Sequence, residues 1–140
     1  VANQVDIDYA GIALKKSKDK NVLEFANAMI ADHKSVIDLA VKLVTKLHVT
    51  PKDNAVSQSL LDGSKATQKM LNSKSGKAFN KAYVDNEVTY HKAVIDVVKN
   101  VLVPQAKNAE LKALLNQVVP ILETHLHHAE MVQKQIEGKK

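Results

Sequence analysis

The chain has 140 residues, of which 45% are apolar and 25% charged, with a formal net charge of +5 at pH 7. This length and balance predict one globular domain over residues 1–140 and argue against disorder. The 20 basic residues are all lysine and are scattered, and the only aromatic residues are two phenylalanines and three tyrosines, so we expect no nucleic-acid partner.

The composition excludes further classes of site. The chain has no cysteine, which rules out disulfides, thiolate metal ligands and cysteine nucleophiles. No apolar run approaches the ~20 residues of a membrane-spanning helix, so we expect no transmembrane segment. Because the chain begins at Val1 instead of methionine, we expect it to have been trimmed or processed, although no signal peptide is visible.

Helical periodicity runs through the chain, and no alternating strand pattern accompanies it. The first expected helix spans residues 3–16, and the second follows Asp19, a predicted N-cap, and extends to residue 48. The third, over residues 53–71, is polar, is interrupted by Gly63 and is expected to bury Leu61 and Ala66.

Two further helices are expected over residues 76–103 and 108–136, with Ser75 as a cap and Pro104 as the end of the former. Short links between long helices imply antiparallel neighbours. The predicted fold is therefore all-α, a ferritin-like up-and-down four-helix bundle with an additional short helix.

Three histidines lie on or beside the apolar stripes of three different expected helices. At ~1.5 Å of rise per residue, His33, His91 and His125 fall within roughly one to two helical turns of a common level. Asp6, on the first expected helix, falls near the same level. A lone histidine on such a stripe is usually a core residue with a hydrogen bond, but three that converge with a carboxylate are typical of a metal site.

Two more residues are candidate ligands by their spacing. Glu87 lies one turn before His91, and His128 lies three residues after His125, so each shares a helix face with its neighbour. Imidazoles with one carboxylate suit a transition-metal ion, Zn, Cu, Fe or Ni, among which the sequence does not choose. The alternative is a metal-free polar core, in which the histidines bond to carboxylates or hydroxyls.

The pattern differs from that of a di-iron bundle, which requires Glu-x-x-His on two helices. None of the four histidines has a carboxylate three residues before it. We therefore expect a mononuclear, histidine-rich site.

Three stretches together resemble a known family. They are Phe25-Ala-Asn-Ala-Met-Ile-Ala-Asp-His33, the run from Gly76-Lys-Ala-Phe to Tyr90-His91, and Pro120-Ile-Leu-Glu-Thr-His125-Leu. They are similar to the ferritin-like bundle family known as domain of unknown function 4142, found mostly in exported bacterial proteins, and the resemblance covers residues 2–132.

The resemblance implies that the family's recurring histidines correspond to His33, His91 and His125. It places the family's acidic position at Asp6, or less well at Asp8, where glutamate is usual, and His128 matches no family pattern. It also implies a periplasmic, outer-membrane-associated or secreted location, and it implies no reaction.

Three functions follow. The leading interpretation is a non-enzymatic, exported helical bundle that binds one transition-metal ion at a mid-bundle site. The second is a structural or interaction bundle with a metal-free polar core, whose exposed apolar surface would meet a second copy in a homodimer or an envelope partner. The third is a mononuclear metal-dependent enzyme, which the absence of a nucleophile constellation or phosphate loop disfavours.

Overall fold

In the computed structural model, which describes residues 2–48 and 55–137, every regular element is a helix. The prediction of an all-α fold is confirmed. The elements are α1 (Ala2–Lys16), α2 (Lys20–Lys46), α3 (Ala55–Asn72), α4 (Gly76–Val97), the π-helical η1 (Val98–Leu102), α5 (Val103–Gln105) and α6 (Ala109–Glu137). Within the described residues, no helix is both long enough and apolar enough to cross a membrane.

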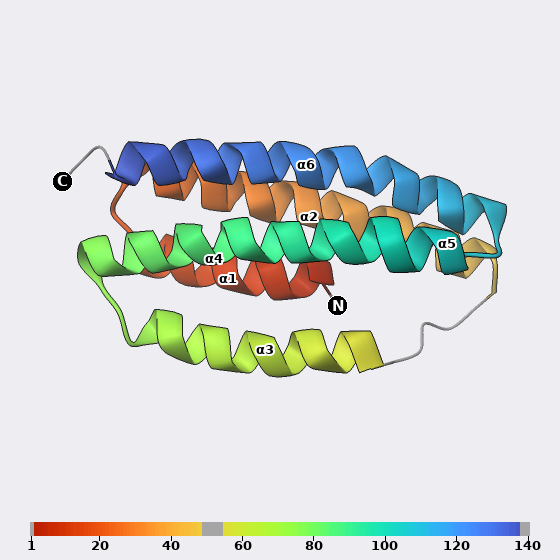
Figure 1. Cartoon of the computed structure of the whole chain (residues 1–140), viewed down its shortest axis with the longest axis horizontal. Coiled ribbons are helices and arrows are strands. Elements are labelled where there is room, and N and C mark those ends of the chain that lie inside the picture. The colour runs from red at the N-terminus through yellow and green to blue at the C-terminus, as the bar shows by residue number, and fades with distance from the viewer. Residues whose placement is uncertain (1, 49–54, 138–140) are drawn as a thin grey trace.

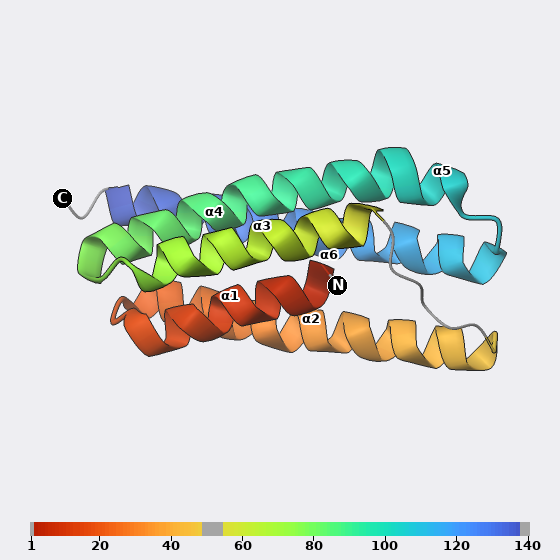
Figure 2. The ribbon, with the colours of Figure 1, turned by 90° about the horizontal axis from the view of Figure 1, so that it is seen from below.

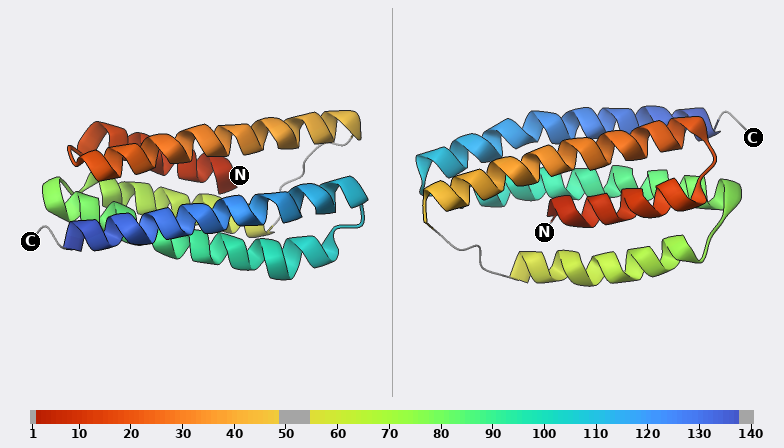
Figure 3. Two further views of the ribbon diagram at one scale, coloured as in Figure 1. Left: turned by 90° about the horizontal axis from the view of Figure 1, so that it is seen from above. Right: turned by 180° about the vertical axis from the view of Figure 1, so that it is seen from behind.

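Helices α1, α2, α6 and α4 pack around a common core, each in contact with the next, and α4 also contacts α1. The long helices alternate in direction along the chain (Figure 1). Figure 2 shows α3 running along the line between α1 and α4, the two long helices that it contacts. Figure 3 shows that α3 lies away from α2 and α6.

Helix α1 is much shorter than its partners. It has 15 residues, whereas α2 has 27 and α6 has 29. Its N-terminus therefore lies partway along the bundle (Figure 1). We call the part beside α1 the closed half, and the part beyond the N-terminus of α1 the open half.

The helix ends follow the sequence only in part. The Asp19 side chain accepts hydrogen bonds from the backbone N–H groups of Asn21 and Val22, so the predicted cap of α2 is confirmed. Ser75 precedes α4, but its side chain makes no capping bond. At the start of α6, the Asn108 side chain acts as a cap and accepts a hydrogen bond from the Leu111 N–H at 2.9 Å.

The end of α4 corrects one expectation. The chain stays helical past Pro104, through η1 and α5. Proline has no N–H to offer the carbonyl four residues earlier, and the Val103 N–H bonds to the Val98 carbonyl, five residues back. The missing donor thus accompanies a widened π-turn, and the helix ends one residue after the proline, at Gln105.

Helix α3 corrects another. It continues across Gly63, and Leu61 and Ala66, expected to be buried, are exposed. Ser64 and Leu71 are buried instead. The buried face is set by contact with both α1 and α4, which a weak periodicity does not reveal.

Buried apolar side chains form two clusters along the bundle axis. In the closed half they are Val5, Tyr9, Ala10, Ala13, Val22, Phe25, Ala26, Met29, Leu71, Phe79, Tyr83, Val84, Val88, Ala129 and Val132. In the open half they are Val94, Ile95, Val98, Val119 and Leu122. The level between the two clusters is occupied by polar side chains.

Candidate metal centre

Five buried polar residues meet between the two apolar clusters. They are Asp6 of α1, His33 of α2, Glu87 and His91 of α4 and His125 of α6, each at most 3% exposed. Each histidine takes one core position on its helix: on α4, Val88 belongs to one cluster and Val94 to the other. The ring centres lie 5.1 Å apart for His33–His125, 5.6 Å for His91–His125 and 5.9 Å for His33–His91.

One nitrogen of each ring contacts an oxygen that can only accept. His33 Nδ1 lies 2.6 Å from Asn3 Oδ1, and His91 Nδ1 lies 2.8 Å from the Glu87 backbone carbonyl. His125 Nε2 lies 2.8 Å from an Asp32 carboxylate oxygen. Each of these ring nitrogens must therefore carry the hydrogen, and in a neutral ring the other nitrogen keeps its lone pair.

The remaining nitrogens are His33 Nε2, His91 Nε2 and His125 Nδ1. All three are buried, and none has a hydrogen-bond partner among the residues that the structure describes. The three histidines can each offer a nitrogen within 4.8 Å of the others. Buried polar atoms are rarely left unsatisfied in proteins, so three together mark a place where a cation fits.

Asp6 brings a carboxylate to two of these three nitrogens. Its Oδ2 lies 2.6 Å from His33 Nε2 and 3.7 Å from His91 Nε2. The contact with His33 is close but is not aligned as a hydrogen bond. Tetrahedral donors around zinc, at bonds of about 2.0–2.1 Å, are separated by about 3.3–3.4 Å, so the distance from Asp6 to His91 is near that separation, whereas the distance to His33 is shorter than it.

The structure distinguishes between the two aspartates of α1. Asp6 is fully buried in the cluster, whereas Asp8 is exposed and accepts a hydrogen bond from Gln4 at 3.0 Å. Burial alone would raise the pKa of Asp6, but contacts with His33 and Glu87 and the charges of His91 and His33 hold it below its usual value. Asp6 is therefore ionised at neutral pH.

The pKa of Glu87 is shifted in the opposite direction. Burial, and then the neighbouring charge of Asp6, raise the pKa of its carboxyl group well above its usual value, which favours the protonated form. Its Oε2 lies 3.4 Å from His91 Nδ1. Asp6, Glu87 and His91 form a second group with ligand atoms within 4.8 Å of one another, which shares His91 with the histidine triad.

Burial also lowers the pKa of both His91 and His125. Their rings are therefore neutral at neutral pH, the form that binds a metal ion. Asp32, at the second nitrogen of His125, gives the carboxylate–histidine arrangement that orients many metal-bound imidazoles.

His128 is not brought to this point. Its ring packs edge-on against Phe25 of α2, with ring centres 5.0 Å apart. Within the described residues it belongs to neither group of candidate ligands. Three residues of helix turn the side chain by about 60° from that of His125, which directs the two rings to different places.

Asn3 was missed by the sequence analysis. It lies three residues before Asp6, so the two share a face of α1. That spacing is the signal that could have found it.

The chain was compared with known proteins. No curated protein and no solved structure matches it significantly. The family described as Domain of unknown function (DUF4142) matches residues 1–132. Because this match covers nearly the whole chain, the protein belongs to that family.

Proposed function

We propose that this protein is a non-enzymatic binding protein that holds one transition-metal ion between its helices. The ligands are His33 Nε2, His91 Nε2, His125 Nδ1 and a carboxylate oxygen of Asp6. Asn3, Asp32 and the Glu87 carbonyl orient the three rings. His128 takes no part, and Glu87 lies beside Asp6.

One observation carries the proposal. In each of three rings, the nitrogen without the hydrogen is buried and has no hydrogen-bond partner among the described residues, and these rings meet. A hydrogen-bonded core would use these lone pairs to accept donors. A single metal ion can be coordinated by all three lone pairs.

The charge of Asp6 supports the same conclusion. An ionised carboxylate with no exposed surface carries a desolvation cost of several kcal/mol unless a cation compensates it. A divalent ion at the three nitrogens supplies that cation. The donors are nitrogen and oxygen without sulfur, which suits Zn, Cu, Fe or Ni.

Metal analysis tests the proposal. Untagged protein is refolded with limiting Zn, Cu, Fe and Ni, and bound metal is counted by mass spectrometry. We expect about one ion per chain in the parent and none when His33, His91 and His125 are all changed to Ala. His128→Ala is the matched control and should keep the ion.

Loss of three buried side chains can unfold the chain, so the single change His91→Gln is measured beside the triple variant, with circular dichroism as the check on folding. A folded His91→Gln protein that binds the ion as tightly as the parent would contradict the proposed ligand set. A folded parent that takes up no metal would contradict the function itself.

The 2.6 Å contact between Asp6 and His33 favours a second candidate function. If His33 carries a proton, the pair is a buried ion pair, and the cluster is a metal-free polar core of a structural or interaction protein. The exposed Leu39 and Val41 of α2 would then meet a second copy or an envelope partner. The export implied by the family resemblance belongs to both proposals, and cell fractionation of the natural host tests it.

A further inference from the structure

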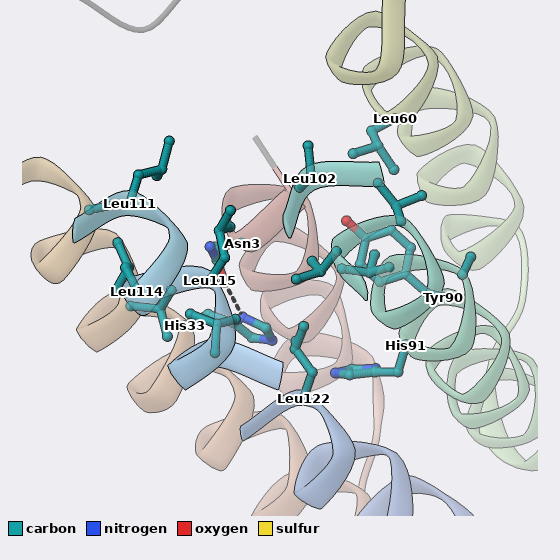
Figure 4. Close-up of a pocket in the computed structure, with 17 residues that line it drawn as sticks. Asn3, His33, Leu60, Tyr90, His91, Leu102, Leu111, Leu114, Leu115 and Leu122 are labelled. Carbon is teal, nitrogen blue, oxygen red and sulfur yellow. Dashed lines mark hydrogen bonds between the residues drawn. The ribbon is translucent and has the colours of Figure 1, made fainter. Parts of the chain in front are cut away.

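An apolar pocket of about 350 Å³ opens in the open half of the bundle. Helices α2, α4 and α6 and η1 provide most of its lining, and most of its wall is leucine and valine (Figure 4). At this level α1 contributes only Asn3 to the wall, and Leu60 of α3 lines another part of it. The π-turn supplies Val98 and Leu102 to the wall, and such turns are frequent at functional sites.

One end of the pocket is polar. His33, His91, Asn3 and Tyr90 line it there, and Figure 4 shows the His33 and His91 rings directed toward one another beside Leu122. Both rings are at least nine-tenths buried, and their Nε2 atoms have no hydrogen-bond partner among the described residues. The pocket therefore reaches the proposed metal centre from the side opposite to the closed half.

We propose that this pocket binds a small monocarboxylate with a hydrocarbon body, whose carboxylate coordinates the ion held by His33 and His91. The inference rests on the proposed function, because the ion anchors the head of the ligand. The body lies along the leucine and valine wall toward Leu111 and Leu115.

Size and polarity define the ligand. An apolar cavity of about 150 Å³ holds benzene, so this pocket suits a body of about twelve non-hydrogen atoms, far smaller than a protein helix. Ligand sites of this kind combine an apolar lining with a few polar groups at one place. Decanoate, with ten carbons and two oxygens, has this size.

The position of the ion defines the head of the ligand. His33 and His91 line the polar end of the pocket, so a head group that enters from the pocket meets an ion held by these two rings. A carboxylate oxygen is an ordinary ligand for such an ion. Zinc can expand to five ligands, and copper, nickel and iron commonly hold more than four, so a coordination position is open to it.

The test uses cobalt(II), whose visible absorption reports its ligands, in the whole chain. Decanoate is titrated into the cobalt-loaded protein, and acetate, the same head without the body, into a parallel sample. We expect decanoate to change the cobalt spectrum and to saturate, while acetate at the same concentration has little effect.

Two variants separate the pocket from the rest of the surface. Ala40→Phe places a ring in the pocket that Ala40 lines, and we expect it to weaken decanoate binding about tenfold or more while cobalt content stays at the parent's level. Val41→Phe is the matched control: Val41 is the next residue of α2, is 54% exposed and does not line the pocket. It should bind decanoate as the parent does.

The outcomes are distinct. If no cobalt binds, the proposed function fails and this inference falls with it. If cobalt binds but decanoate leaves its spectrum unchanged, or acts no better than acetate, this inference alone is wrong. Equal decanoate binding by folded Ala40→Phe and parent proteins would also overturn it.

Discussion

In the closed half of the bundle, fifteen buried residues from five helices form one apolar core, whereas the apolar cluster of the open half has five residues and lies beside a pocket of about 350 Å³. The two halves share α2, α4 and α6 and differ mainly in the presence of α1. Beyond the N-terminal end of α1, a pocket lies beside the other long helices. The histidine cluster lies at this boundary, where closely packed walls can hold rings in place and a pocket can reach them.

The largest expected contrast comes from truncating one side chain in each half. Phe25 is fully buried in the closed half, so Phe25→Ala should lower the free energy of unfolding by about 3–5 kcal/mol. Leu115 borders the pocket and is only partly buried, so Leu115→Ala should lower it by about 1 kcal/mol. Urea denaturation measures both, and equal losses would break the distinction between the halves.

The free energy of unfolding should depend on metal bound at the boundary between the two halves. At a free concentration of 100 times the dissociation constant, an ion bound only by the folded chain raises the free energy of unfolding by about 2.7 kcal/mol. A chelator should remove this gain. Asp6→Asn should lose most of it and Asp8→Asn none, because Asp8 is exposed. Thermal or urea unfolding with and without the metal measures the gain, and a chelator-insensitive parent would disprove it.

The smallest effect comes from adding the same atoms to each half. Ala10 of α1 is fully buried in the closed core, so Ala10→Leu should destabilise the protein by about 1–3 kcal/mol. Ala40 lines the pocket, and Ala40→Leu should leave stability unchanged or raise it by up to about 1 kcal/mol. If both variants unfolded at the same urea concentration, the open half would be packed as tightly as the closed one.

The sequence was most informative where one residue controls one local feature. Asp19 ends the break before α2 because its carboxylate serves two N–H groups. Counting helical rise brought His33, His91 and His125 to one level, and the structure brings the three rings together. Both arguments depend on geometry within single helices and on short links.

The rest depends on packing between helices. The buried face of α3 is determined by two neighbours, which is why Ser64 rather than Ala66 is buried. Spacing alone placed His128 beside His125, although its ring packs on Phe25. The pocket could not be predicted from periodicity, because the apolar stripes of α2 and α6 continue past the level at which α1 begins.

The short length of α1 has a consequence for kinetics. Within Lys20–Lys46 the last buried residue of α2 is Val36, and within Ala109–Glu137 the first of α6 is Val119. The ends of α2 and α6 in the open half thus have no buried side chains of their own to stabilise them. Such regions open locally at a small fraction of the free energy of global unfolding. If the chain binds the proposed ion, we expect the ion to reach the histidines through this end, so that local opening would set the rates of metal loading and release while the closed half keeps the molecule folded.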